Sequence, residues 1–155
     1  MNTKKPTHKL AEVKATYKRG KQVDEIQFTS PDSVYNTLKK VYDDDSLDHV
    51  EKCYLLLLNR ANKYIGYVSL SSGGVSGTVI DPKVVFQHAL LSNASAIILS
   101  HNHPSGNLTP SEEDKRLTHK IYLAGQHLEI TLLDHIIVTR NGYTSMANDF
   151  PNIFN

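Results

Sequence analysis

Two histidines and one aspartate in the middle of the chain have the residue types and the spacing of metal ligands. His101 and His103 are separated by one residue and come directly after the apolar segment 94–100. In an extended chain, residues two apart point the same way with Cα atoms roughly 6.5–7 Å apart, so both imidazoles can reach one metal ion. Asp114 follows in the opening turns of a predicted helix, from which its carboxylate can return to the end of the strand. The pattern predicts a site for a single cation.

The ligand types indicate what this cation would do. Two imidazoles and one carboxylate, with a position left for water, are typical of a catalytic rather than a structural zinc site. Such a site needs a base, and Glu51 is the acidic residue that opens an otherwise apolar stretch. Ser111 lies three residues before Asp114 on the same helical face, where its hydroxyl can stabilise an oxyanion. We therefore interpret Glu51 as the general base and Ser111 as an oxyanion donor.

Each piece taken alone has a simpler interpretation. A His-x-His pair occurs in loops by chance, and Ser111 and Asp114 are also favoured in a first turn by the helix dipole. Glu51 at the start of a strand is usually solvated. The joint spacing favours the site, because His-x-His-Pro followed at these intervals by Ser and Asp is hard to obtain by independent accidents.

One further acidic residue is a candidate for orienting a ligand. Asp134 lies in an apolar strand, where a buried carboxylate can hold a zinc-bound imidazole through its second nitrogen. The histidines that have no partner at ligand spacing are interpreted as core or surface residues; they are His8, His49, His88, His119 and His127.

Hydrophobic periodicity and end signals predict the elements that come before these residues. A helix is expected over 31–42 with Ser30 as its cap, followed by a hairpin of strands 53–58 and 64–70. Asp81 and Pro82 open a second helix, for which the predicted apolar stripe is Val84, Val85, His88 and Leu91.

The remaining elements surround the candidate site. Segment 94–100 is apolar on both faces, which indicates a central strand of a covered sheet. A capping box at 109–112 predicts a third helix that stops near Gly125. A strand over 129–139 then turns back at Asn141-Gly142 into a short strand.

Length and composition restrict the class of protein. A chain of 155 residues with a net charge of +1 is expected to form one domain, with no global field to attract nucleic acid. The longest apolar run has six residues, against the roughly 20 that a membrane-spanning helix needs. No secretory signal is recognised, so we expect a cytoplasmic protein with no membrane partner. The single Cys53 excludes an intramolecular disulfide and a multi-cysteine metal site.

The chain is expected to divide into an arm, a domain and a tail. Residues 1–21 carry seven Lys or Arg against one acidic residue, which predicts a basic, partly disordered arm. Part of 9–18 is alternatively an edge strand, and contact of the arm with nucleic acid is the sharper hypothesis. The domain is placed at 22–147, and 148–155 is a tail that either docks or frays.

The site residues also carry a resemblance to a known family. His101-Asn-His103-Pro-Ser-Gly106, followed by Ser111-Glu-Glu-Asp114, resembles the JAB/MPN+ (JAMM) metallopeptidase signature in its RadC-like form. Segment 133–138 and the hairpin at Leu58-Asn59 match that group too, so the resemblance covers roughly residues 30–147.

The resemblance implies a fold and a chemistry. The fold is α/β (α+β), with a mixed sheet flanked by helices in a three-layer, cytidine-deaminase-like architecture. Zinc would be held at the positions of His101, His103 and Asp114, with Glu51 as the base and Ser111 as the oxyanion donor. The implied function is zinc-dependent hydrolysis of peptide or isopeptide bonds in a protein or peptide substrate.

An alternative function belongs to a different class. RadC-like proteins carry an N-terminal helix-hairpin-helix region linked to DNA, and the roughly 30 residues before the first predicted helix are too few for it. A DNA-repair role therefore transfers poorly from the resemblance. The alternative is a RadC-like accessory or binding module in DNA repair or mobile-element processing, without robust catalysis and with the basic arm as its contact, and the net charge of +1 speaks against it. A metal-dependent nuclease ranks last, because no phosphate-gripping group is recognised near the histidines. Substrate and oligomeric state stay open.

Overall fold

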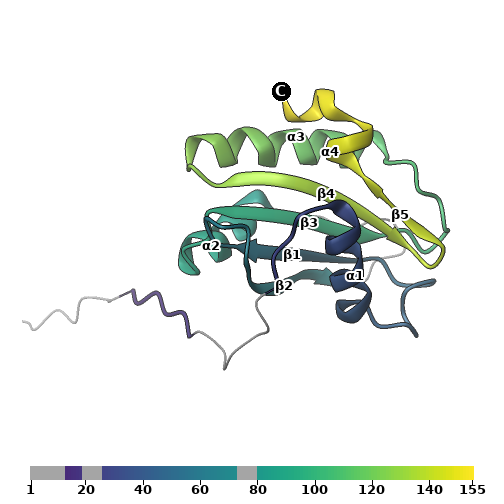
Figure 1. Ribbon diagram of the computed structural model, residues 1–155, viewed down its shortest axis with the longest axis horizontal. Coiled ribbons are helices and arrows are strands. Elements are labelled where there is room, and N and C mark those ends of the chain that lie inside the picture. Colours follow the sequence, from purple (N-terminus) through teal and green to yellow (C-terminus); the bar gives the residue numbers. More distant parts are fainter. Residues whose placement is uncertain (1–12, 19–25, 73–79) are drawn as a thin grey trace, which may run out of the picture.

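A computed structural model describes residues 13–18, 26–72 and 80–155. Its centre is one five-stranded sheet with the order β2-β1-β3-β4-β5 (Figure 1). The strands are β1 (Lys52–Leu58), β2 (Tyr64–Ser72), β3 (Ala96–Asn102), β4 (Thr131–Thr139) and β5 (Gly142–Ser145). β3 and β4 are parallel, whereas the other neighbours are antiparallel. The mixed sheet that the resemblance implies is confirmed.

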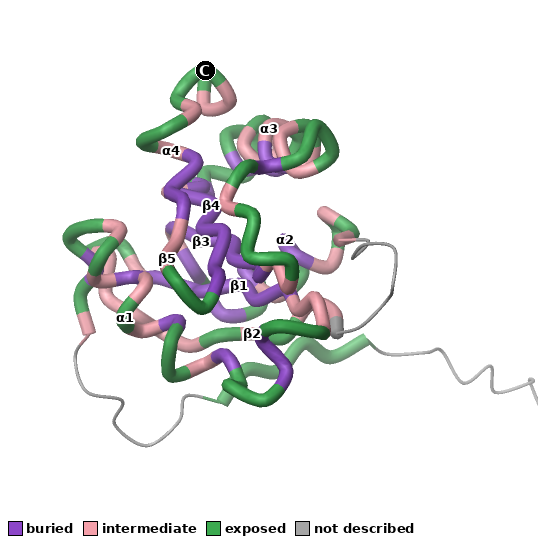
Figure 2. The backbone as a smooth tube through the Cα atoms, turned by 90° about the vertical axis from the view of Figure 1, so that its right-hand side faces the viewer, coloured by how far each residue is buried: buried purple, intermediate pink, exposed green. Residues whose placement is uncertain are grey.

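Helices cover both faces of this sheet, which gives three layers. α1 (Pro31–Val41) lies on one face, and α2 (Pro82–Leu91) and α3 (Glu112–His127) lie on the other (Figure 2). Every residue of the middle strand, β3, is buried. The prediction of a central strand with cover on both sides is therefore correct.

Alternation along β3 decides which helix each side chain meets. Ile98 packs in the cluster beneath α1, whereas Ile97 and Leu99 pack beneath α2 and α3. Since side chains of a strand point alternately to the two faces, His101 continues the α3 side and Asn102 continues the α1 side. The end of β3 therefore presents the polar His101 to the α2 and α3 layer and the polar Asn102 to the α1 layer.

The first two helices begin as predicted, but the buried stripe of α2 differs. Ser30 caps α1 and Asp81 caps α2, each accepting a backbone N–H in the first turn. The buried residues of α2 are Val85, Phe86 and Ala89, so the predicted stripe was wrong by about one position. A helix with apolar residues on several sides has no single stripe that marks its inner face, so contact with the sheet selects that face.

The third helix begins later and ends later than predicted. Its cap is Ser111, which accepts a hydrogen bond from the Asp114 N–H while Asp114 accepts one from the Ser111 N–H. The capping box is thus formed by Ser111 and Asp114 rather than by the predicted residues 109–112. A capping box needs the side chain of each partner within hydrogen-bond distance of the other's backbone N–H. The helix also continues through Gly125 to His127.

Gly125 is a place of close approach. A Cβ built at this position would lie 2.3 Å from the carbonyl oxygen of Ile130 and 3.6 Å from the ring of Phe86. The glycine therefore lets the chain that enters β4 pass directly over the helix.

Replacing Gly125 with Ala is expected to lower the free energy of unfolding by about 1–3 kcal/mol, because backbone must move to relieve the overlap. Chemical denaturation measures the change. Gly66→Ala is the matched control, since a Cβ there meets nothing within 4 Å. Equal stability of the two variants would show that the approach at Gly125 is not tight.

The ends of the described chain differ in how they pack. Residues 13–18 are exposed and form neither helix nor strand; the rest of the predicted basic arm lies outside the described residues. At the other end, α4 (Met146–Asp149) and η1 (Pro151–Phe154) lead back to α3, where the ring of His119 bonds to the carbonyl of Ile153. The C-terminal tail thus docks.

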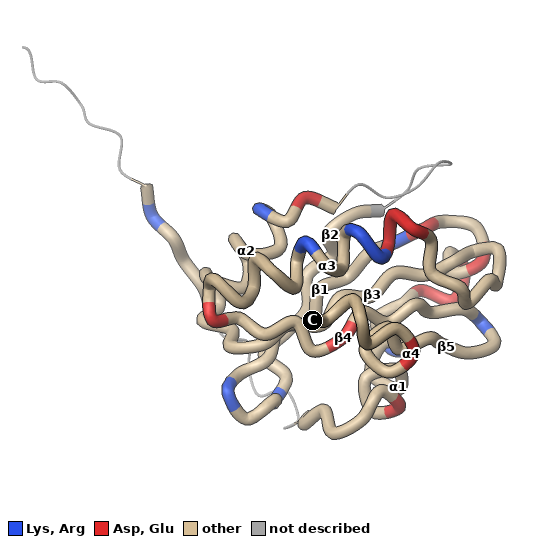
Figure 3. Tube along the Cα trace, turned by 90° about the horizontal axis from the view of Figure 1, so that it is seen from above, with Lys and Arg blue, Asp and Glu red and all other residues tan. Residues whose placement is uncertain are grey.

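The distribution of charge and the character of the helices bear on nucleic-acid and membrane partners. Figure 3 shows Lys and Arg interspersed with Asp and Glu over the described elements. Among the described residues, none of the helices has both the length and the apolar character needed to cross a membrane.

Candidate metal centre

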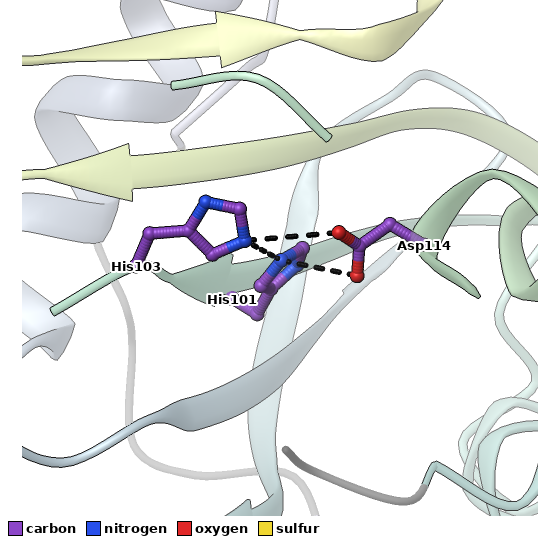
Figure 4. Close-up of side chains that lie close together, drawn as sticks. All are labelled: His101, His103 and Asp114. Atoms are coloured by element: carbon purple, nitrogen blue, oxygen red, sulfur yellow. Dashed lines mark hydrogen bonds and ion pairs between the residues drawn. The ribbon is translucent and has the colours of Figure 1, made fainter. Parts of the chain in front are cut away.

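His101, His103 and Asp114 converge at one point beside the end of β3 (Figure 4). The Nε2 atoms of the two imidazoles are 2.9 Å apart. His101 Nε2 lies 3.3 Å from Asp114 Oδ1, and His103 Nε2 lies 3.7 Å from Asp114 Oδ2. Two imidazole nitrogens and one carboxylate therefore lie close enough together to bind a single metal ion.

These distances suit a tetrahedral zinc ion. Bonds of 2.0–2.1 Å at tetrahedral angles place neighbouring ligand atoms about 3.3 Å apart. The two Nε2 atoms are 2.9 Å apart, and they lie 3.3 and 3.7 Å from different oxygens of the Asp114 carboxylate. With one ligand atom taken from each residue, the three atoms all lie within 4.8 Å of one another. The donor types and their spacing fit the ion, and three ligands leave a fourth position for the reaction.

The hydrogen bond of His103 to the backbone prepares it to be a ligand. Its Nδ1 lies 2.6 Å from the carbonyl oxygen of Asn107. A carbonyl only accepts, so the Nδ1 carries a proton, and the Nε2 is the atom through which this ring can bind a cation. Asp114 contacts the same ring, and this interaction raises the pKa of His103 despite partial burial.

Asp114 is held in its ionised form. Burial by itself would raise the pKa of this carboxyl, but hydrogen bonding with His101 and His103 outweighs burial and holds the pKa well below its usual range. An ionised carboxylate is the form that binds a cation. The start of α3 supplies it, because the capping interaction fixes Asp114 relative to Ser111.

The hydroxyl of Ser111 is bonded within this capping interaction. It donates to Asp114 Oδ2 over 2.7 Å, and the Ser111 N–H donates to the same oxygen over 2.7 Å. Ser111 is exposed and lines the cleft next to the cluster. Its proton therefore points at Asp114, and serving an oxyanion requires the hydroxyl to rotate.

Glu51 lines the same cleft. The cleft has a volume of about 670 Å³ and is lined by Glu51, His103 and Ser111 among others. Cys53 pairs with His101 between β1 and β3, so the same register continued by two residues places Glu51 opposite His103. Of the residues predicted from the sequence, Glu51, His103 and Ser111 thus line one cleft, and His101 and Asp114 cluster with His103 beside it.

Comparison with known proteins adds the family. The family model of the RadC-like JAB domain matches residues 28–150, which is more than half of the chain. This chain belongs to the RadC-like JAB domain family. The matched range contains every residue of the candidate site.

Relatives named as UPF0758 proteins share this domain. The protein of Coprothermobacter proteolyticus is 35% identical over 148 residues, covering 91% of this chain and 63% of the relative. The protein of Staphylococcus haemolyticus is 34% identical over 148 residues, covering 92% and 64%. The protein of Flavobacterium johnsoniae is 44% identical over 99 residues, covering 64% and 43%. The chain spans less than two thirds of the length of each of these relatives.

In this RadC-like JAB domain, the residue between the two histidines anchors the segment that carries Glu51. The amide nitrogen of Asn102 donates to the carbonyls of Leu47 and Val50, over 2.7 and 2.9 Å. Its oxygen accepts the Lys52 N–H over 2.7 Å. One buried side chain on the α1 side of β3 thus fixes the loop on either side of Glu51. Sequence reasoning treated Asn102 only as a spacer.

Replacing Asn102 with Ala is expected to lower the free energy of unfolding by about 1–3 kcal/mol, because three backbone groups lose their partner near the core. Urea denaturation measures the loss. Asn36→Ala, at an exposed position of α1, is the matched control. An unchanged denaturation midpoint would contradict the anchoring role of Asn102.

Sequence reasoning named the wrong residue of the Asp134-His135 pair as the partner of a ligand. His135 Nε2 lies 2.7 Å from His101 Nδ1, whereas Asp134 bonds to Ser145 and to the N–H groups of His135 and Ala147. Neighbouring residues of β4 point to opposite faces of the sheet, so only His135 faces the cluster. Burial raises the pKa of Asp134, whose role is to hold the chain where β5 meets α4.

A second residue near the cluster was also missed. Thr118 is fully buried in α3, with its hydroxyl 2.6 Å from His135 Nδ1. The signal in the sequence was its position four residues after Asp114, which places both on one helical face. The neighbouring Leu117 is only partly buried, whereas Thr118 and Ile121 are buried residues of α3.

Proposed function

We propose that this chain is a zinc-dependent hydrolase of peptide or isopeptide bonds. The observation that carries the proposal is the convergence of His101, His103 and Asp114 at the wall of a cleft that Glu51 and Ser111 also line. Membership of the RadC-like JAB domain family supports it. The cleft has a volume of about 670 Å³, which lies within the usual range of ligand-binding clefts.

Zinc at this position would supply Lewis-acid polarisation of a carbonyl and a lowered pKa for a water molecule. Glu51 would take the proton from the attacking water, because it is the acidic residue in the lining of the cleft and the β1–β3 register, continued by two residues, places it beside His103. It would then pass this proton to the leaving amine nitrogen, which must gain a proton as the C–N bond breaks. One carboxyl thus serves both halves of the reaction.

Ser111 would hold the oxygen of the substrate carbonyl. Its hydroxyl is free to rotate into the cleft without releasing Asp114, because the Ser111 N–H bonds to the same carboxylate oxygen. A hydroxyl aimed at the developing oxyanion stabilises the transition state more than the ground state. Asp114 keeps its place at the start of α3 while this happens.

Metal content and cleavage together test the proposal. Protein purified without chelators is expected to hold stoichiometric zinc by elemental analysis. A library of peptides that includes lysine-linked isopeptides is then incubated with it, and new amines are identified by mass spectrometry. We expect cleavage that stops when zinc is removed and returns when zinc is restored. Protein without stoichiometric metal, or cleavage that survives removal of all metal, would contradict the proposal.

A further inference from the structure

We propose that Thr118 and His135 form a directed hydrogen-bond chain that holds His101 in the tautomer able to bind a metal ion through Nε2. The inference rests on the proposed zinc site and adds two positioning residues to it. Both are fully buried, and they reach the cluster only through the His101 ring and the Asp114 backbone.

The tautomer of His101 is not decided by its immediate partner. A neutral imidazole carries one proton, so binding through Nε2 requires that proton on Nδ1. For His103 a carbonyl accepts the Nδ1 proton and settles the matter. The Nδ1 of His101 instead faces His135 Nε2 at 2.7 Å, and that nitrogen can either donate or accept. The direction of this hydrogen bond therefore depends on the other partner of His135.

His135 offers two arrangements. Its ring is fully buried, and its nitrogens contact Thr118 and His101 rather than a carboxylate, so a neutral ring with one proton is favoured. With the proton on Nδ1, His135 donates to Thr118 and accepts from His101. With the proton on Nε2, it donates to His101, and a neutral His101 must then carry its own proton on Nε2, where a metal would bind.

Thr118 selects between the two. Its Oγ1 lies 2.6 Å from the carbonyl oxygen of Asp114, one helical turn earlier. Two oxygens this close need a proton between them, and a carbonyl has none, so Thr118 donates to Asp114. The hydroxyl must then accept from His135, which is 2.6 Å away. The sulfur of Met146, at 3.7 Å, is a much weaker acceptor for the same proton.

Every proton in the chain therefore points toward α3. His101 donates to His135, His135 donates to Thr118, and Thr118 donates to the carbonyl of Asp114. This leaves a lone pair on His101 Nε2, which lies 2.9 Å from His103 Nε2 and 3.3 Å from Asp114 Oδ1. A single helix thus supplies one ligand directly and orients another through its backbone.

Thr118→Val removes the hydroxyl but keeps the branched shape of the side chain. We expect zinc affinity, measured by competition with a chelator, to fall about 10–100-fold, the usual effect of losing a hydrogen-bond partner of a metal-binding histidine. Thr118→Ser is expected to bind zinc as the unmodified protein does. Thr37→Val is the matched control, because Thr37 makes the same kind of bond to the Ser33 carbonyl on α1, at 3.2 Å.

Nitrogen NMR of the metal-free, unmodified protein gives a second readout that no substitution can disturb. We expect His135 to carry its proton on Nδ1. A proton on Nε2 of His135, or a folded Thr118→Val protein with unchanged zinc affinity, would overturn the inference while leaving the zinc site intact. Failure of the unmodified protein to bind zinc would instead overturn the proposed function. The positioning role of the Thr118–His135 hydrogen-bond chain would then fall as well.

Discussion

Glu51→Gln is expected to lower the rate of peptide cleavage by about 10²–10⁴-fold, the usual contribution of a general acid–base. Gln has nearly the same shape as Glu but cannot take a proton from water. Glu51 lines the same cleft as His103 and is not one of the three clustered ligand residues. Bound zinc should therefore stay stoichiometric in this variant. Cleavage rates and elemental analysis on one preparation measure both effects.

The control for this variant is Asp45→Asn. Asp45 is an exposed acidic residue in the loop that leads to Glu51, so its replacement removes the same charge nearby. We expect it to cleave at close to the unmodified rate. Normal turnover by Glu51→Gln on a substrate that the unmodified protein cleaves would remove Glu51 from the mechanism.

Asp114→Asn is expected to lose zinc altogether under conditions in which the unmodified protein retains it. The neutral amide is a poor ligand for zinc, and the two imidazoles alone provide neither the third ligand nor the charge. The loss of affinity should exceed the roughly 10–100-fold loss that follows from removing a partner of a ligand. Asn can still accept the Ser111 N–H, so α3 should keep its cap.

Thermal unfolding measures this effect without a substrate. A ligand that binds only the folded state raises its stability according to concentration and affinity. Added zinc should therefore raise the Tm of the unmodified protein and leave that of Asp114→Asn unchanged. Glu113→Gln is the control, because Glu113 is an exposed acid in the same first turn of α3. An equal rise in Tm for Asp114→Asn would show that zinc binds elsewhere.

Most elements of the fold could be predicted because their signals are local. Ser30 and Asp81 cap their helices as expected, since a cap depends on residues within one turn. The apolar run of β3 indicated burial on both faces, and the strand is indeed central. The start of α3 was misplaced because Thr109 and Ser111 both match a cap, and only the geometry of the Asp114 side chain distinguishes them.

The candidate site was predictable only in part, for a similar reason. His101, His103 and Asp114 were found from spacing along the chain, and the structure brings them together. The contact between His101 and His135 joins two residues that are 34 positions apart in the sequence, on neighbouring strands. It depends on the register of β3 against β4, which shifts between Ile97 and Ile98. No local pattern specifies such a shift.

By itself, the sequence determined which candidate ligand and catalytic side chains are present, and the order in which they follow one another on strand, loop and helix. Tertiary structure alone decided which face of the sheet each group meets. Shifting the pairing register of a strand by one residue moves each of its side chains to the other face of the sheet. That register is set by packing between segments that are distant in the sequence. For that reason His135 rather than Asp134 contacts the ligand His101. The packing of α3 against the sheet likewise brings Thr118 to His135, 17 residues away in the sequence.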